Sequence, residues 1–385
     1  MTGKPVKLLH LHSTFDAGGK ERRAVALMNR WGRGGRDLPI EHHIVSAQPA
    51  ATGARTLIDR NVTARFPFGF PPLAGKLGIA RLRQLARAMQ GYDLILTYNW
   101  GAMDACMAHA IFAPTMGLAP LVHHEDGFNA DEANGLKTSR NWYRRIALAR
   151  ASALMVPSRQ LEDIALTVWH QPRARVHRIS NAIDTALYAR KPKADVLPRV
   201  VKRSGEKWLG TLAGLRAVKN LPRMVRALKE LPPEWHLVIL GEGPERAAIA
   251  AEAIRLEVGH RVHLPGHVAD PSLAIGLFDL FALSSDSEQA PLSVIEAMAA
   301  GLAVASPAVG DVAEMVAEPN RAFITPAGDE DAFSQALARL AADEPLRRII
   351  GKANREHARA EFDESVMAAH YARVYAQALG ANPFP

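Results

Sequence analysis

Hydrophobic positions along the chain fall into short apolar runs of strand length that alternate with stretches of helical spacing. In the first half, the predicted strands read VKLLHLH, EHHIVSA, DLILTYN, PLVHHE and ALMVPS, and helices are predicted near residues 21–31, 77–90, 102–112 and 139–151. Strands that are apolar throughout and alternate with helices are typical of parallel sheets covered on both faces.

This alternation is interrupted once, by a segment rich in lysine, arginine and proline at 188–207, which we interpret as a linker. It then restarts with the strand-like runs KWLGTLAGL, EWHLVILG, RVHLPG, LFALSS, GLAVAS and AFITP. Two such blocks predict an α/β protein with two doubly wound, Rossmann-like domains, 1–187 and 188–363, facing a cleft. Ligands of open parallel sheets bind beyond the carboxyl ends of the strands, so motifs that follow strands are the candidates for a site.

The composition, 48% apolar and 22% charged over 385 residues, is that of an ordinary soluble globular protein. Cys106 is the only cysteine, which excludes a disulfide framework and a thiolate metal site and favours a reducing compartment. The first apolar run is too short for a secretory signal, and the longest uncharged window, 105–122, contains two prolines. We therefore expect no transmembrane segment.

A net charge of +8 has three interpretations: binding to nucleic acid, to an anionic membrane surface, or to phosphate-bearing small molecules. Aromatic residues make up only 6% of the chain and do not interleave with the basic clusters, and no zinc-finger or RNP pattern occurs. No nucleic-acid partner is therefore expected. The clusters at 81–87, 140–150, 173–178 and 190–207 favour a membrane surface and a phosphate ligand, although solvated helix faces explain most of these charges.

Two candidate sites follow strands in the first domain. Gly18 and Gly19, in HSTFDAGGKERRA, precede a helix predicted to start near Lys20, so backbone amides and the positive helix end point toward a ligand, unless the pair is an ordinary tight turn. No G-x-G-x-x-G pattern occurs, which disfavours a dinucleotide site. His123 and His124, in PLVHHEDGFNADE, come at the end of a strand, either as site residues or as hydrogen-bonded loop residues.

No metal site is expected in this chain. The acids that follow His124 are adjacent to each other instead of spaced as metal ligands. A second cluster, His260, His263 and His267, lies on a predicted strand and its exit, where neighbouring side chains point to opposite faces.

GTLAGLRAVKN and VILGEGPERAAI contain the basic and glycine-rich elements of the second domain. Arg216 and Lys219 lie at a loop-to-helix junction, where they suit the neutralisation of a diphosphate. Gly241 and Gly243 follow the next strand and allow the backbone to approach a ligand such as a base or a ribose closely. Both motifs follow strands, at the edge where a ligand is expected.

The stretch EQAPLSVIEAMAAGLAVAS, from Glu288 to Ser306, carries two carboxylates around a helix N-terminus. Pro291 suits the first helical position and Gly301 the C-terminal cap, so Glu288 lies in the preceding loop and Glu296 roughly 8 Å along the helix. The free N–H groups of the helix start suit a phosphate, which both acids would repel on direct contact. We therefore predict a nucleotide sugar, with its sugar hydroxyls at Glu288, its diphosphate at the helix end and its ribose at Glu296.

Taken together, these motifs resemble those of the retaining glycosyltransferases of family 4, which have the GT-B fold. EQAPLSVIEAMAAG is similar to the E-x7-E motif of that family, GLRAVKN resembles its phosphate-binding loop, and GEGPER resembles the following glycine turn. SNAIDT resembles the segment near the end of the first domain, and GGKERR the N-terminal glycine loop. The similarity extends from residue 7 to the closing helix, and the order and spacing of the motifs make it fairly specific.

The resemblance implies transfer of a sugar from a nucleotide-diphosphate donor, with UDP expected, and with retention at the anomeric carbon. It implies neither a metal nor another cofactor. Glu288 would contact the sugar, Glu296 the ribose and Lys219 the diphosphate, and His124 is preferred to His123 as the first-domain histidine near the donor sugar. The predicted catalytic set is His124, Glu288, Lys219 and Arg216, and the donor-binding set is Gly18, Gly19, Gly241, Gly243, Ala290, Pro291, Leu292 and Glu296.

The resemblance also implies where the enzyme works. The closing helix at 364–380, an amphipathic pattern with Tyr371 and Tyr375 on one face, would cross back and complete the first, acceptor-side domain. The acceptor would be a cell-surface polysaccharide or glycolipid. The enzyme would be cytoplasmic and peripheral at the inner membrane face, with the nucleotide sugar, a lipid-linked acceptor and anionic lipid as partners.

One departure from the family pattern bears on activity. Gly214 stands where family members carry an arginine, and Ala290 replaces the commoner glycine. Arg216, two residues on, is our hypothesis for the cation that reaches the same oxygens. The alternative is a degenerate, non-catalytic member that binds a nucleotide sugar without turnover. A nicotinamide-dependent oxidoreductase is disfavoured because the dinucleotide fingerprint is absent.

Overall fold

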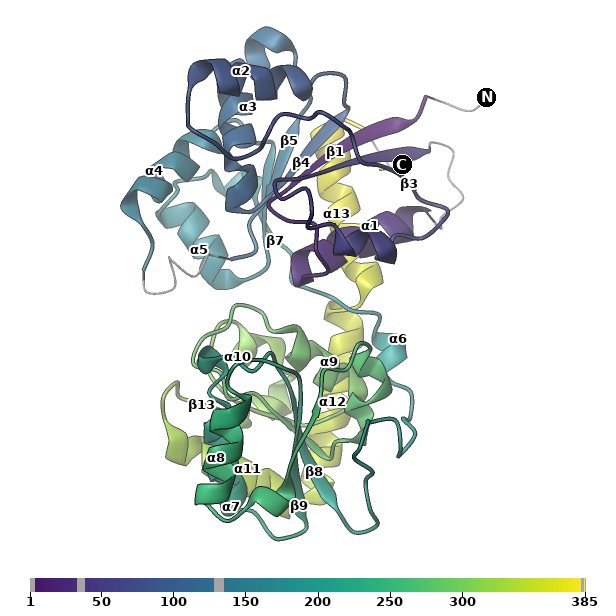
Figure 1. Cartoon of the computed structure of the whole chain (residues 1–385), viewed down its shortest axis with the longest axis vertical. Coiled ribbons are helices and arrows are strands. Elements are labelled where there is room, and N and C mark those ends of the chain that lie inside the picture. Colours follow the sequence, from purple (N-terminus) through teal and green to yellow (C-terminus); the bar gives the residue numbers. More distant parts are fainter. Residues whose placement is uncertain (1–3, 33–38, 128–134, 382–383, 385) are drawn as a thin grey trace. The chain divides into compact units, whose positions relative to one another are not determined.

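The computed structural model describes residues 4–32, 39–127, 135–381 and 384. The chain forms two compact units (Figure 1). Unit 1 contains the chain up to Ser180 together with the segment from Met367 onward, and unit 2 is Asn181–Val366. The division between Ser180 and Asn181 falls ahead of the predicted boundary at residue 187.

Unit 1 is built on a seven-stranded sheet in the order β3-β2-β1-β4-β5-β6-β7, in which every neighbouring pair is parallel. The strands are β1 Val6–His12, β2 Ile40–Ser46, β3 Thr63–Arg65, β4 Leu94–Tyr98, β5 Leu121–His124, β6 Ala153–Val156 and β7 Val176–Arg178. The chain runs outward from β1 to β3 and then returns to the other side of β1, so the strand order reverses between β1 and β4.

Six α-helices belong wholly or mostly to the described part of unit 1. They are α1 Gly19–Gly32, α2 Ile79–Ala88, α3 Met103–Met116, α4 Thr138–Ala147, α5 Arg159–Thr167 and α13 Glu364–Leu379. Helices α2 to α5 cover one face of the sheet, and α1 and α13 cover the other (Figure 1). The closing helix therefore packs on the first unit, as the family resemblance implies, and buries both Tyr371 and Tyr375.

Histidines and tyrosines line the face of the sheet that α13 covers. Because side chains alternate along a strand, Leu9 and Leu11 of β1 join the core under α2 to α5, while His10 and His12 point the other way. His10 Nε2 lies 3.0 Å from His42 Nδ1. The His12 ring stacks on Tyr98 at 3.9 Å between centroids, and neither of its nitrogens has a hydrogen-bond partner within the described residues.

This cluster predicts that the stability of unit 1 depends on pH. Burial lowers the pKa of His10, His12, His42 and His124, that of His42 to about 3, so these rings are neutral in the folded chain. The unfolded chain binds the additional protons below about pH 6.5. We therefore expect the free energy of unfolding to fall by roughly 1 kcal/mol for each such histidine between pH 6.5 and pH 5.5.

Urea unfolding at a series of pH values checks this expectation. Burial alone would lower the pKa of His123, but Cys106 and the Glu125 carboxylate raise it to about 9, so His123 adds little to the change below pH 6.5. A His12→Phe variant keeps an aromatic ring against Tyr98 and is expected to show a shallower loss, because one proton fewer is taken up on unfolding. Identical pH dependence in the variant and the natural chain would contradict this account.

Unit 2 repeats the architecture with a six-stranded parallel sheet in the order β10-β9-β8-β11-β12-β13. Its strands are β8 Lys207–Leu212, β9 Trp235–Leu240, β10 Val262–Gly266, β11 Leu280–Ala282, β12 Val304–Pro307 and β13 Ile324–Thr325. Its α-helices are α6 Thr185–Tyr188, α7 Leu221–Lys229, α8 Arg246–Arg255, α9 Leu292–Ala300, α10 Val312–Met315, α11 Glu330–Ala342 and α12 Glu344–Glu361. Strand order reverses between β8 and β11.

Every strand predicted from the apolar runs is present, and the prediction of two doubly wound parallel-sheet domains is confirmed. The prediction missed β3 and β7, which are three-residue strands at the two edges of the first sheet, where little apolar surface is needed. The segment between α6 and β8 forms no helix or strand, but it lies inside unit 2, where Leu197 joins the core, so it does not link the two units as predicted. No helix in the described ranges combines the length and apolarity needed to cross a bilayer.

Candidate functional site

The strand order of unit 2 brings the two predicted charged residues together. Lys219 follows β8 and Glu288 follows β11, and these strands are neighbours at the point where the order reverses. The Lys219 Nζ and Glu288 Oε1 atoms form an ion pair, and Ser285 Oγ donates to the same carboxylate oxygen at 2.6 Å. Both charged side chains are mostly enclosed, at 15% and 12% exposed. An acid and a base therefore meet where open α/β sheets bind ligands.

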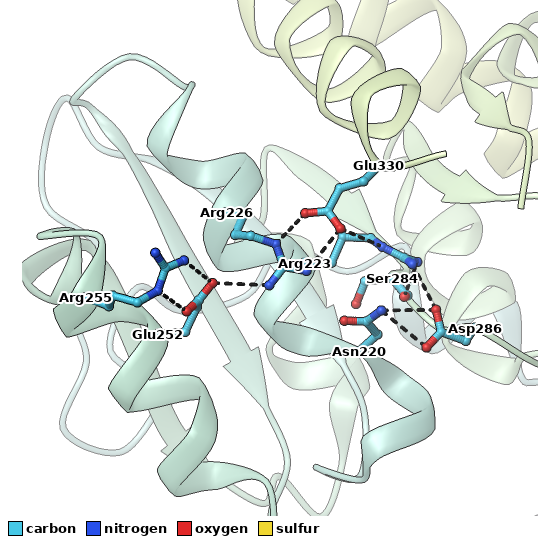
Figure 2. Close-up of polar contacts among 8 residues, drawn as sticks. All are labelled: Asn220, Arg223, Arg226, Glu252, Arg255, Ser284, Asp286 and Glu330. Carbon is cyan, nitrogen blue, oxygen red and sulfur yellow. Dashed lines mark hydrogen bonds and ion pairs between the residues drawn. The ribbon is translucent and has the colours of Figure 1, made fainter. Parts of the chain in front are cut away.

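Arg223 connects the loop after β8, which carries Lys219, to the loop after β11, which carries Glu288 (Figure 2). Its guanidinium donates to the Ser284 carbonyl at 3.0 Å and to Asp286 Oδ1 at 2.9 Å, and Asn220 Nδ2 donates to both oxygens of Asp286. Ser284 Oγ donates in return to the Lys219 carbonyl at 2.8 Å. The sequence analysis missed Arg223; the sequence shows only an arginine four residues after Lys219, and its burial is visible only in the structure.

A second part of this network joins three helices behind the loops. Figure 2 shows Arg226 of α7 between Glu330 of α11 and Glu252 of α8. Its Nη2 donates to Glu330 Oε2 at 3.0 Å and its Nη1 to Glu252 Oε1 at 3.1 Å. Arg255 donates to both oxygens of Glu252 at 2.7 and 2.8 Å. Helix α7, which starts just after Lys219, is thus also bound to α8 and α11 by ion pairs.

A cavity of about 330 Å³ lies wholly within unit 2, and neither Lys219 nor Glu288 is among its lining residues. Loops after β8, β9 and β10 and the first turns of α9 line it, with Gly214, Gly241, Ser293 and Glu296 among the residues. Tyr188 Oη donates to Glu296 Oε1 at 2.8 Å. Burial and the Glu296 carboxylate raise the pKa of Tyr188, so the hydroxyl keeps its proton and orients the acid. The structure therefore places Glu296 in a pocket of ligand size.

Helix α9 starts one residue later than predicted. Pro291 has φ −70° and ψ 119°, which is extended, and it is the N-cap, so the first helical residue is Leu292. The Pro291 carbonyl accepts from Val294 N at 3.1 Å, and no side chain caps this end. Ala290 is buried just before it, and its carbonyl accepts from Asn181 Nδ2 at 3.2 Å. Gly301 ends the helix with φ 81°, as predicted.

The structure explains why glycine is needed at positions 241 and 243, and the explanation differs from the predicted close approach of a ligand. Gly241 and Gly243 have φ of 153° and 157°, and a Cβ on them would lie 1.8 Å from the Ala213 carbonyl oxygen and 2.4 Å from that of Leu215. The close approach is therefore between two backbone segments of the protein, the loops after β8 and β9. Gly241 also lines the cavity, and a role for either glycine in binding the donor stays a prediction.

Arg216 lies beside the position where family members carry an arginine. Gly214 is exposed, and a Cβ placed on it would lie 3.7 Å from Arg216 Nε, an ordinary contact distance. Arg216 is also exposed, and within the described chain its guanidinium forms no hydrogen bond or ion pair. This geometry is compatible with the hypothesis that Arg216 takes over the missing cation.

In unit 1, α1 starts at Gly19, and the Gly18 carbonyl accepts from Arg22 N at 2.9 Å. A Cβ on Gly19 would meet open space, whereas one on Gly18 would lie 2.8 Å from Glu21 Oε2. Glu21 is buried in the first helical turn and pairs with Lys20 at 3.1 Å. The positive helix end that was predicted to face a ligand therefore already faces an acid.

His123 and His124 are the last residues of β5 instead of loop residues, and both are enclosed. His124 Nε2 lies 2.7 Å from the Tyr375 hydroxyl and its Nδ1 lies 3.1 Å from the Thr97 carbonyl. The partly exposed group that follows the strand is Asp126, whose carboxylate forms two hydrogen bonds with Arg23, at 2.5 and 2.9 Å. A role for His124 at the donor sugar stays a prediction.

Two family models match the chain in succession. The model of Glycosyltransferase Family 4 matches residues 17–187, and the model of Glycosyl transferases group 1 matches residues 194–357. The chain belongs to glycosyltransferase family 4. Each of the two matches corresponds to one of the predicted α/β blocks.

Individual relatives of this family 4 chain are distant. It is 25% identical over 211 residues to N-acetyl-alpha-D-glucosaminyl L-malate synthase of Bacillus anthracis, spanning 54% of this chain and 55% of that protein. It is 26% identical to D-inositol 3-phosphate glycosyltransferase of Xylanimonas cellulosilytica, over 99% of this chain and 98% of that protein. Anabaena HepE, solved in complex with UDP, has the same fold, with a TM-score of 0.79, 20% identity and coverage of 96% and 100%.

The family 4 chain contains no cluster of three histidine, cysteine, aspartate or glutamate side chains within the described residues that could hold a metal ion. His263 instead pairs with His236, with Nε2 and Nδ1 3.0 Å apart. Cys106 is a buried free thiol. Metal independence of the reaction stays a prediction.

Proposed function

We propose that this chain is a retaining, metal-independent glycosyltransferase that transfers a sugar from a nucleotide-diphosphate donor, with UDP as the nucleotide. The Lys219–Glu288 ion pair at the reversal of strand order carries the proposal, and the cavity of the same unit that contains Glu296 supports it. The fold shared with HepE, which was solved with UDP, supports the choice of nucleotide.

The ion pair suggests how the donor is received. In the chain by itself, the Lys219 ammonium neutralises Glu288. The diphosphate oxygens of a donor compete for this ammonium, and Glu288 then accepts a hydrogen bond from a sugar hydroxyl. Lys219, Arg216 and the free amides at the start of α9 stabilise the negative charge that develops on the departing diphosphate. The nucleoside diphosphate leaves and the acceptor attacks on the same face of the sugar, so the anomeric configuration is retained.

Binding of nucleotides tests the donor class. Thermal melting of the full chain with UDP, GDP, ADP and NAD in turn should show the largest rise with UDP, because a ligand bound only by the folded state raises the melting temperature. A rise with NAD alone would contradict the proposal. Donor hydrolysis or transfer then separates the enzyme from the alternative, a non-catalytic member that binds a nucleotide sugar without turnover.

An Arg216→Ala variant is expected to lower turnover roughly a hundredfold, which is the usual effect of removing one preorganised donor from a developing anion. Steady-state transfer or donor hydrolysis measures this. Arg348→Ala removes an exposed arginine of the same unit that pairs with Glu344, and should leave turnover unchanged. A near-normal rate for Arg216→Ala would show that Arg216 does not replace the missing cation.

We further propose that the acceptor is a lipid-linked cell-surface polysaccharide or a glycolipid, reached from the cytoplasmic side of an anionic membrane. The exposed face of α4 supports this, because Trp142 and Ile146 are 57% and 53% exposed and Arg145 lies 5.1 Å over the Trp142 ring. Apolar and basic groups on one helix face suit an anionic bilayer surface.

A Trp142→Ala variant tests the membrane contact. It is expected to weaken cosedimentation with phosphatidylglycerol vesicles severalfold, since the ring is mostly exposed and its removal leaves the core intact. Phosphatidylcholine vesicles serve as the uncharged control. Equal sedimentation of the variant and the natural chain with phosphatidylglycerol would contradict membrane docking through α4.

A further inference from the structure

A second cavity, of about 440 Å³, lies wholly in unit 1 and outside the proposed donor site. Its walls come from α5, from the edge strand β7 with the turn before it, and from the closing helix α13. The basic run at 173–178, which the sequence analysis noted and the proposed function does not use, forms one side. The cavity therefore needs an explanation of its own.

The cavity has more positive than negative charge. Arg173, Arg178 and Arg373 line it, and Glu162 is the one carboxylate among its lining residues. Glu162 pairs with Arg173 at 2.8 Å and with Arg178 at 3.4 Å. Arg373 Nε donates to the Ala369 carbonyl at 3.4 Å and forms no ion pair within the described chain. One carboxylate thus holds two guanidinium groups in place, and the third is available to an anion.

Other lining residues indicate an organic anion instead of a bare ion. Val176, Ile179 and Val374 are buried and form an apolar wall beside the arginines. Burial, followed by the charge of Arg173, lowers the pKa of His177, so its imidazole is neutral and can hydrogen-bond without adding charge. The volume falls within the range of roughly 300–1,000 Å³ that is typical of small-molecule sites.

The arginines of the run at 173–178 have different contacts. This difference argues against the interpretation that the run is only a solvent-exposed basic surface. Arg175 Nη1 donates to the Ala149 carbonyl at 2.8 Å and does not line the cavity. Arg173 and Arg178, on either side of it, line the cavity and meet at Glu162. The fold therefore directs two members of the run into the cavity together with Arg373 from a distant part of the chain.

We propose that this cavity binds a phosphate ester, whose phosphate contacts Arg373 and Arg178 and whose organic part rests on Val176, Ile179 and Val374. Guanidinium groups match phosphate oxygens with paired hydrogen bonds, and the surplus charge compensates a phosphate dianion. A soluble phosphate ester and a lipid headgroup share this chemistry. The proposal does not depend on the donor site, because none of its residues belongs to unit 2.

Calorimetric titration of the full chain tests the proposal with three probes: glycerol 3-phosphate, monomeric dioctanoyl phosphatidic acid, and dioctanoylglycerol. Both phosphates should bind and dioctanoylglycerol should not. Tighter binding of the phosphatidic acid assigns a lipid, and equal binding assigns a soluble ester. The double variant R178Q/R373Q is expected to raise the Kd of the bound phosphate at least tenfold, and Arg60→Gln, an exposed arginine elsewhere in unit 1, should not change it.

A variant that is expected not to weaken binding controls for the possibility that substitutions in this cavity act only by unfolding the protein. Glu162→Gln removes the one negative charge of the cavity, while its amide oxygen can still accept a hydrogen bond from Arg178, so this variant should bind the phosphate probe at least as tightly as the natural chain. Weaker binding by Glu162→Gln, an unchanged Kd in the double variant, or failure of both phosphates to bind would each overturn the proposal. Thermal melting of each variant verifies that it is folded.

Discussion

A Lys219→Gln variant is expected to lose transfer activity by roughly a thousandfold, at the upper end of what removal of one charged donor costs. The substitution acts twice. It removes the ammonium that would neutralise the departing diphosphate, and it leaves the largely enclosed Glu288 carboxylate without its ion-pair partner. That uncompensated charge would then repel the diphosphate. The kcat of sugar transfer, or of donor hydrolysis, measures the effect.

Lys202→Gln is the matched control, because Lys202 is similarly enclosed and pairs with Asp279 at 2.6 Å in the same unit. Lys202→Gln should lower the free energy of unfolding about as much as Lys219→Gln does, while leaving kcat near normal. Lys219→Arg keeps the charge and should retain more activity than Lys219→Gln. If Lys219→Gln, folded by its melting curve, works within a few-fold of the natural chain, the proposed role of the ion pair is wrong.

A Gly241→Ala substitution is expected to destabilise unit 2 by about 4 kcal/mol or more. The backbone at this position has φ 153°, which is accessible essentially to glycine alone, and the new methyl carbon would lie 1.8 Å from the Ala213 carbonyl oxygen. Both loops follow adjacent central strands and cannot separate without breaking the Ala213 N to Leu240 O hydrogen bond of 3.0 Å. Urea unfolding of the full chain measures the loss.

Gly205→Ala separates the two contributions to this effect. Gly205 also has a positive φ, 87°, but a Cβ there meets nothing within 4 Å, so only the backbone conformation is penalised, by about 1 kcal/mol. A loss at Gly241 no larger than that at Gly205 would show that the loops after β8 and β9 can move apart. In that case the cavity beside Glu296 would also be less rigid than the structure indicates.

The sequence by itself determined the features that depend on local chemistry. Apolar runs and helical spacing specified two blocks of parallel strands. The period with which side chains alternate in direction along a strand or a helix is a property of that segment alone, so it can be read from the sequence. The end of α9 at Gly301 followed from the conformational freedom of glycine. The rule that ligands bind beyond strand ends then pointed to Lys219, Glu288 and Glu296 before any contact was known.

Only the tertiary structure decided which of these residues meet. Lys219 reaches Glu288 because β8 lies beside β11, and strand order depends on how helices pack over a whole sheet, which no local pattern encodes. The same global packing enclosed His124 against Tyr375 of the closing helix, gave Gly241 its backbone neighbour, and brought Arg373 to the run at 173–178. Contacts between distant segments are consequences of packing, so they became visible only in the folded chain.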